Sequence, residues 1–324
     1  MTLEQHTHIL KDFRFANGDV LNELRLHCTT LGNPHGEPVV LLHGTNGSAQ
    51  TLLTPEWHQT LFGPGQALDL SRYRVIVPDA LGSGRSSKPS DGLRRRFPRY
   101  NYKDMVQAQH RLFTECLGLS RVRLMLGYSM GGMHTWLWAQ HHPAFMALAV
   151  PMACMPAPMS GRNWMMRRLV IDTIQNDPDW MQGNYTSQPR LGQAALVFYS
   201  VATSGGTRGL HRLGPNRAAA DAWLDQRLAQ DPVADANDAL YQYEAGADYH
   251  GGEALEQIQA QVLAINNTDD ERTPPELGLM EQALARVPRG RCLWVPASAH
   301  TLGHATLGSP RFWKDELQAL LEGA

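Results

Sequence analysis

The sequence predicts an α/β protein whose mostly parallel central sheet is flanked by helices and interrupted by an inserted helical cap. Short apolar runs alternate along the chain with longer stretches of helical periodicity, and this alternation stops between residues 156 and 259. The runs are continuously apolar, which is typical of strands buried on both faces, as in a parallel sheet.

Six apolar runs have the length and composition of buried strands. They are Val39–His43, Tyr73–Pro78, Val122–Leu126, Ala147–Met152, Val262–Ile265 and Leu293–Val295. An earlier run, Glu23–Thr30, alternates more between polar and apolar residues, and we expect it to form an antiparallel edge strand.

Two helices are predicted within the alternating region. Residues 102–117 carry apolar side chains at helical spacing, with Asp104 near the start and Gly118 just past the end, where each is favoured. A second helix should begin after Ser129 and stop before Pro143, because proline cannot continue a helix.

The stretch from 156 to 259 is rich in methionine and tryptophan and includes a helix-like run, Arg167–Ile174. Ala195–Val201 is the one strand-like run that stands out in it. We therefore interpret residues 156–259 as a mostly helical cap. Residues 1–155 and 260–324 then form the core.

Composition narrows the class of function. The chain has 324 residues, 43% of them apolar, and a formal net charge of −2, so a polyanionic partner such as nucleic acid is not expected. Its four cysteines are scattered, which favours reduced thiols over a zinc site or disulfides. The polar first 13 residues lack a secretory signal pattern, and no 18-residue apolar window predicts a membrane span, so we expect a cytoplasmic protein.

A glycine-rich pattern follows one predicted strand and precedes a predicted helix. Gly127-Tyr128-Ser129-Met130-Gly131 reads G-x-S-x-G, and its position between Val122–Leu126 and the following helix is the context that this motif needs. In that context, the turn exposes the serine hydroxyl above a helix N-terminus, which favours negative charge. Ser129 is therefore the predicted nucleophile.

An acyl-transfer site also needs donors for the oxyanion of the tetrahedral intermediate. The amide of Met130, directly after the nucleophile, is one candidate. The second should come from the loop after the first predicted parallel strand, residues 43–47, where we prefer the amide of Thr45 and place Asn46 next.

The triad acid and base are expected after the last two predicted strands. Asp269 and Asp270 both follow Val262–Ile265, and we prefer Asp270, four residues before Pro274. His300 and His304 both follow the final strand, and we prefer His304, since the preceding glycine lets the loop turn over the nucleophile. The chain order Ser, Asp, His is that of the α/β-hydrolase fold.

Several longer motifs carry a resemblance to a known family. They are Tyr102-Lys103-Asp104-Met105-Val106, Gly127-Tyr128-Ser129-Met130-Gly131-Gly132-Met133, Asp177-Pro178-Asp179-Trp180, Gly183-Asn184-Tyr185, Asp235-Ala236-Asn237-Asp238-Ala239-Leu240-Tyr241 and Gly303-His304. With these motifs the chain resembles the homoserine O-acetyltransferase family of the α/β-hydrolase superfamily. Counting back from Pro274 along that family's acid loop again gives Asp270.

One loop departs from the pattern of the acetyltransferases. The segment Asp79-Ala80-Leu81-Gly82-Ser83-Gly84-Arg85-Ser86 resembles the loop of ordinary α/β-hydrolases, and the nucleophile follows Gly-Tyr rather than Gly-Gly. The resemblance therefore implies an esterase-like branch: a serine hydrolase that cleaves a carboxylic ester with a short acyl group through an acyl-enzyme. The alternative is an O-acyltransferase that moves an acyl group from acyl-CoA to homoserine or another small alcohol. A binding protein without turnover is a third reading.

The predicted serine, histidine and aspartate can carry out the reaction without a cofactor or a metal ion. We expect no cofactor, no metal and no membrane partner, and a small-molecule ester as substrate. The resemblance also implies a homodimer.

Overall fold

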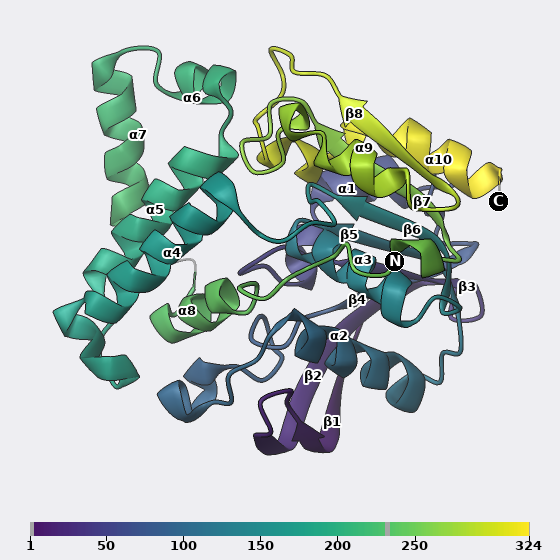
Figure 1. Ribbon diagram of the computed structural model, residues 1–324, viewed down its shortest axis with the longest axis horizontal. Coiled ribbons are helices and arrows are strands. Elements are labelled where there is room, and N and C mark those ends of the chain that lie inside the picture. Colours follow the sequence, from purple (N-terminus) through teal and green to yellow (C-terminus); the bar gives the residue numbers. More distant parts are fainter. Residues whose placement is uncertain (1–2, 231–233, 324) are drawn as a thin grey trace.

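The computed structural model describes residues 3–230 and 234–323. Residues 1–2 and 324 of the predicted core and residues 231–233 of the predicted cap lie outside the described residues. Within the described ranges, eight strands form one sheet in the order β1-β2-β4-β3-β5-β6-β7-β8 (Figure 1). The strands are β1 (Glu4–Arg14), β2 (Val20–Gly32), β3 (Glu37–Leu42), β4 (Tyr73–Pro78), β5 (Val122–Tyr128), β6 (Met146–Met152), β7 (Gln261–Asn267) and β8 (Gly290–Val295).

The neighbours from β4 to β8 in this order pair in parallel, which confirms the mostly parallel sheet and places the six predicted runs in β3 to β8. The edge assignment was wrong. Glu23–Thr30 lies in β2, which pairs antiparallel with β4 on one side and with β1 on the other, so β1 is the edge strand. Strand β1 escaped prediction because it is mostly polar and exposed, with only Leu10 and Phe13 buried among its described residues.

Helices cover both faces of the sheet. Within the described residues they are α1 (Pro55–Leu61), α2 (Tyr102–Arg111), α3 (Met130–His141), α4 (Gly161–Asn176), α5 (Arg190–Ser204), α6 (Thr207–Leu213), α7 (Arg217–Ala229), α8 (Ala236–Glu244), α9 (Leu279–Leu284) and α10 (Lys314–Glu322). Both predicted core helices are present. The first continues beyond Arg111 as a π-helical turn, Leu112–Cys116, and the second ends before Pro143.

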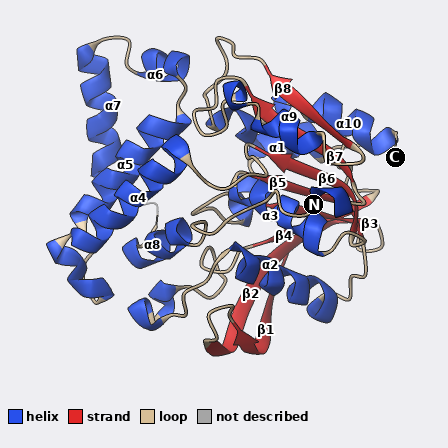
Figure 2. Ribbon diagram, viewed as in Figure 1, coloured by secondary structure: helices blue, strands red, loops and turns tan. Residues whose placement is uncertain are grey.

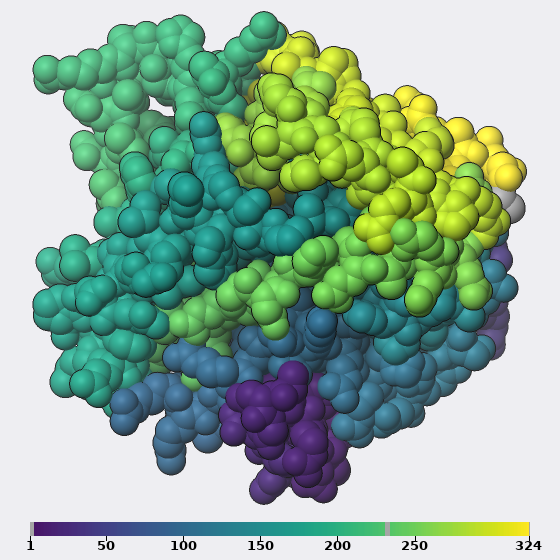
Figure 3. All heavy atoms as spheres, in the orientation of Figure 1, coloured from purple at the N-terminus to yellow at the C-terminus, as the bar shows by residue number. Residues whose placement is uncertain are grey.

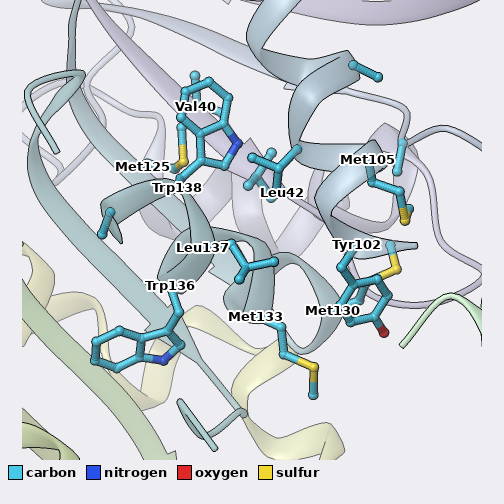
Figure 4. Close-up of a cluster of buried hydrophobic side chains, with 14 of the residues drawn as sticks. Val40, Leu42, Tyr102, Met105, Met125, Met130, Met133, Trp136, Leu137 and Trp138 are labelled. Atoms are coloured by element: carbon cyan, nitrogen blue, oxygen red, sulfur yellow. The ribbon is translucent and has the colours of Figure 1, made fainter. Parts of the chain in front are cut away.

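Strand β3 shows how the sheet separates two layers of core. Val40 and Leu42 pack in a cluster with side chains of α2 and α3 (Figure 4). The same cluster also includes side chains of α9. Val39 and Leu41 point the other way, into the cluster with α1 and α10. Successive strand side chains face opposite sides, so a run that is apolar at every position is buried by both layers.

Helices α4 to α8 lie between β6 and β7 in the chain and form an all-helical layer at one end of the molecule (Figure 2). They have a hydrophobic cluster of their own, which includes Val170, Ile174, Tyr199 and Leu240. In Figure 3 the teal and green surface of this layer meets the yellow-green surface of the C-terminal part of the core.

The strand-like run Ala195–Val201 was wrongly interpreted, because it lies inside α5. Within it Val197 and Tyr199 are buried, while Phe198 between them is 59% exposed on the outer face of the helix. A short apolar run does not by itself distinguish a strand from a helix. The predicted helical run Arg167–Ile174 lies in α4, as expected.

Two other expectations concern the whole chain. Cys28, Cys116, Cys154 and Cys292 form no disulfide in this structure. In the part of the chain that the structure describes, no helix has the length and apolar character needed to cross a bilayer.

The β1–β2 hairpin gives a test of the packing. Leu24 is 0% exposed and Ile9 is 44% exposed, although both lie in this hairpin. Leu24→Ala should lower the free energy of unfolding by about 2–5 kcal/mol, because it leaves a cavity in the core. Ile9→Ala, the matched control, should change it by less than about 0.5 kcal/mol. Urea unfolding of both variants measures the difference, and equal losses would contradict this packing.

Candidate active site

Ser129 occupies a tight turn between β5 and α3. Its backbone has φ 55° and ψ −111°, a region that L-residues other than glycine rarely adopt. The turn is held from both sides, since the Ser129 amide donates to the Met152 carbonyl at 2.8 Å and the Ser129 carbonyl accepts from the Met133 amide at 3.0 Å. Strain of this kind persists only where the surroundings fix it, and it is concentrated at functional sites.

Three glycines around Ser129 allow the turn to pack. A Cβ on Gly131 would lie 2.1 Å from the Leu42 carbonyl oxygen, and one on Gly127 would lie 2.0 Å from the Gly131 carbonyl oxygen. Gly132 approaches Met152 and Cys154 almost as closely. Helix α3 can therefore begin directly against β3, β5 and β6, which places its N-terminus beneath the serine hydroxyl.

The structure brings Ser129, His304 and Asp270 into one hydrogen-bonded chain. His304 Nε2 lies 2.9 Å from Ser129 Oγ, and His304 Nδ1 lies 2.8 Å from Asp270 Oδ2. The three side chains come from the ends of β5, β7 and β8, and all three residues are at most 4% exposed. Because the carboxyl ends of parallel strands share one edge of the sheet, distant parts of the chain meet there.

The surroundings of His304 and Asp270 favour a neutral imidazole beside an ionised carboxylate. Burial lowers the pKa of His304, and the nearby Arg272 lowers it further, while Asp270 opposes both. For Asp270, burial raises the pKa, but the adjacent His304 and the Arg272 amide outweigh burial and hold it below its usual value. A neutral imidazole can accept a proton, and an adjacent ionised carboxylate can stabilise the resulting cation.

The loop after β7 separates the roles of the two aspartates. Asp270 Oδ1 accepts from the Arg272 amide at 2.8 Å, and Oδ2 accepts from the Thr273 hydroxyl at 2.9 Å in addition to facing His304. Asp269 instead accepts from Asn267 and Thr301, both at 2.7 Å. Asp269 therefore ties the acid loop to the histidine loop, and Asp270 alone of the two meets the imidazole.

The histidine loop is fixed by a glycine and a tyrosine. Gly303 has φ +53°, and a Cβ there would lie 2.4 Å from Glu271 Oε2 and 2.5 Å from the Gly206 amide nitrogen. The hydroxyl of Tyr128, the residue before Ser129, donates to the His304 carbonyl at 2.9 Å. His300 is exposed and lies outside this arrangement.

The acid loop also contacts the helical layer. Arg272 Nε donates to the Thr203 carbonyl at 3.0 Å, and its guanidinium lies 4.7 Å from the centre of the Tyr199 ring. The Gly206 amide donates to Glu271 Oε1 at 2.6 Å. Residues on either side of the C-terminus of α5 therefore support the loop that carries Asp270.

The two predicted oxyanion donors lie beside Ser129. Met130 is the first residue of α3, and Thr45 follows Gly44, where an added Cβ would lie 3.5 Å from Ser129 Cβ. Within the described residues, neither the Thr45 amide nor the Met130 amide donates to another group. Asn46, the second choice, has φ 58°.

Sequence reasoning missed the network that shapes this loop. His43 Nδ1 donates to the Gly44 carbonyl at 2.8 Å, and His43 Nε2 accepts from the Ala80 amide at 3.0 Å. Asp79 accepts from the amides of Ala49 and Arg85 at 2.7 and 2.8 Å. The loops after β3 and β4 thus brace each other, and the acidic residue of the D-x-x-G-x-G-x-S pattern provides part of the link.

A cavity of about 420 Å³ opens next to Asp270. It lies between α3, the start of α4 and the acid loop, and its lining includes Met133, Met155, Met159 and Asn163. Its size suits a small molecule, and the methionines give part of its wall an apolar, adaptable surface. Among the described residues no group of three or more His, Cys, Asp or Glu side chains could hold a metal ion.

The chain belongs to the α/β hydrolase fold family, whose model matches residues 37–303. Within that family, its predicted resemblance to the homoserine O-acetyltransferases is confirmed. The homoserine O-acetyltransferase of Pelobacter propionicus is 34% identical over 209 residues, which are 59% of this chain and 56% of that enzyme. A probable acyltransferase of Methanothermobacter thermautotrophicus is 25% identical over 310 residues and 92% of each chain.

In three homoserine O-acetyltransferases that this chain resembles, the similar region covers between 41% and 56% of the length of the relative. Solved structures match along nearly the whole chain. Esterase E22 has a TM-score of 0.85 with 19% identity, covering 99% of this chain and 100% of that one. The homoserine O-acetyltransferase of Bacillus anthracis has a TM-score of 0.84 with 21% identity, covering 99% and 98%. At these identities the likeness establishes the fold.

The protonation of His304 gives a direct test of the site. Because burial and Arg272 lower its pKa, the imidazole should stay neutral as the pH falls through 6.5, the ordinary histidine value. Nitrogen NMR of histidine-labelled protein measures this titration, and His304→Gln identifies the signal by its loss. A His304 that titrates above pH 6.5 would contradict the electrostatics described.

Proposed function

We propose that this protein is a serine hydrolase that cleaves a carboxylic ester with a short acyl group. The observation that carries the proposal is the buried chain from Ser129 Oγ through His304 to Asp270, with contacts of 2.9 and 2.8 Å. A hydroxyl, a neutral base and an ionised acid in that geometry are the parts of a nucleophilic triad. Ser129, His304 and Asp270 are the proposed catalytic residues.

The reaction proceeds through an acyl-enzyme. His304 Nε2 takes the Ser129 proton as Oγ attacks the ester carbonyl, and the amides of Met130 and Thr45 donate to the resulting oxyanion. The intermediate collapses, the ester C–O bond breaks, and His304 gives its proton to the departing alcohol. Water then attacks the acyl group in the same way, releasing the carboxylic acid and restoring Ser129.

Hydrolase and acyltransferase share every step up to the acyl-enzyme. The D-x-x-G-x-G-x-S loop after β4 favours the hydrolase. The second candidate, transfer of an acyl group from acyl-CoA to homoserine or another small alcohol, is favoured by the relatives named homoserine O-acetyltransferase. The two differ in whether water or an alcohol reaches the acyl-enzyme.

The division into domains is part of the proposal. Residues 156–259 act as a cap over a core of residues 1–155 and 260–324, and the contacts of Glu271 and Arg272 with Thr203 and Gly206 support this arrangement. The cap limits what enters the cavity beside Asp270. A homodimer, a cytoplasmic location and a reaction without cofactor complete the proposal.

The first experiment follows alcohol release from p-nitrophenyl acetate without CoA or acceptor. Wild-type protein should turn over continuously, and Ser129→Ala should lose activity on the order of 10⁶-fold, because the nucleophile is gone. A single burst of alcohol without further turnover would mean that the acyl-enzyme forms but water does not reach it. That result would favour the acyltransferase over the hydrolase. If the wild-type protein released no alcohol, the proposal of a short-acyl esterase would be wrong.

The two aspartates provide a matched pair. Asp270→Asn should lower kcat for p-nitrophenyl acetate by about 10⁴-fold, because an amide no longer stabilises the imidazolium or holds its tautomer. Asp269→Asn should keep most of the activity, since Asp269 bonds Asn267 and Thr301 rather than His304. Steady-state kinetics of both variants decide the matter, and the reverse order of losses would transfer the acid role to Asp269.

A further inference from the structure

Helix α4 carries a charged side chain into the interior of the protein. Arg167 is 0% exposed. Its Nε donates to Asn163 Oδ1 and its Nη2 to Thr45 Oγ1, both at 3.2 Å, and Nη1 has no hydrogen-bond partner. Its guanidinium also lies 5.1 Å from the centre of the Tyr243 ring.

This arginine lacks a compensating negative charge. None of the ion pairs among the described residues includes Arg167. Burial raises the pKa of Tyr102 and of Tyr243, so both tyrosines stay neutral. An arginine remains charged in proteins, and an unpaired buried charge is destabilising. An unpaired positive charge in a buried site attracts a negative charge that forms near it during a reaction.

The position of Arg167 indicates where that negative charge arises. Its hydrogen-bond partner Thr45 belongs to the loop whose Gly44 packs against Ser129. Asn163, which holds Nε, lines the cavity beside Asp270. One guanidinium thus contacts both the oxyanion loop and a residue of the cavity wall, and it reaches them from a helix that lies outside the core.

We propose that Arg167 is a positioning residue of the oxyanion hole, supplied by the cap. This inference rests on the proposed function. Through Nη2 it holds the Thr45 side chain, which keeps the Thr45 amide aimed at the reacting carbonyl oxygen. Its uncompensated charge favours the negatively charged tetrahedral intermediate over the neutral ester. The oxyanion hole is therefore complete only while α4 is seated on the core.

Four variants test this role with p-nitrophenyl acetate: Arg167→Met, Arg167→Lys, Thr45→Val and the double variant Thr45→Val with Arg167→Met. Arg167→Met should lower kcat by about 10- to 100-fold with little change in KM, less than the 10²–10³-fold cost of removing a direct oxyanion donor. Arg167→Lys should recover part of the loss. The double variant should be no worse than Arg167→Met, because both changes remove one interaction.

The matched control is Arg168→Met. Arg168 is the next residue of α4, but it is exposed and pairs with Asp172 on the outer surface. This variant should keep wild-type kinetics. Thermal melting of each variant reports folding. If Arg167→Met does not fold, Thr45→Val and Arg167→Lys still carry the test.

Two readouts distinguish this role from simple packing. Propylboronic acid forms a negatively charged tetrahedral adduct with a serine nucleophile, so its inhibition constant should rise in Arg167→Met in parallel with the loss of kcat. The acid limb of the pH profile of kcat/KM should also move to higher pH in Arg167→Met but not in Arg167→Lys. The reason is that a positive charge disfavours the His304 imidazolium.

Wild-type kcat and boronic acid affinity in Arg167→Met would overturn the inference while leaving the triad intact. Additive losses in the double variant would also overturn it, because they would separate Arg167 from Thr45. A Ser129→Ala protein that still turns over ester would instead overturn the proposed function, so the two failures are distinguishable.

Discussion

The site depends on one constraint, the backbone of Ser129 held at a positive φ. That conformation exists because Gly127 and Gly131 let β5, α3 and β3 approach within distances that a Cβ would forbid. The close approach places the N-terminus of α3 below the hydroxyl and brings the Met130 amide beside it. The core layers of the sheet therefore support the proposed chemistry, because they maintain a local strain that the turn alone would release.

Asp270 and His304 depend on a different set of contacts. Asp270 and His304 lie on loops that are tied together by Asp269 and Thr301, and the acid loop is joined to α5 by Arg272. Ser129 is thus held in place by the sheet, and Asp270 and His304 are held largely by the loops and the helical layer. Loosening of that layer should disturb the orientation of His304 before it disturbs Ser129.

The amino-acid sequence predicted the features that follow from local hydrophobic periodicity or from a motif placed between a strand and a helix. Buried strands such as Tyr73–Pro78 are visible because both core layers demand apolar side chains at every position. Strand β1 was not predicted because an edge strand is held mainly by backbone hydrogen bonds, which leave no apolar pattern in the sequence. Adjacent residues Asp269 and Asp270 stayed unresolved until the turn geometry was known. Arg167 carries no sequence signal, because its proposed role rests on contacts with Thr45 and Asn163 that only the fold creates.

The insertion between β6 and β7 has a consequence for how the protein matures. These neighbouring strands pair across residues 153–260, so the sheet cannot be completed until that whole segment has been made. Asp270 and His304 follow the inserted segment in the chain and are therefore synthesised after it. During synthesis the chain therefore passes through a long stage in which Ser129 is present without its partners, and β6 is an unpaired edge that a chaperone would need to protect.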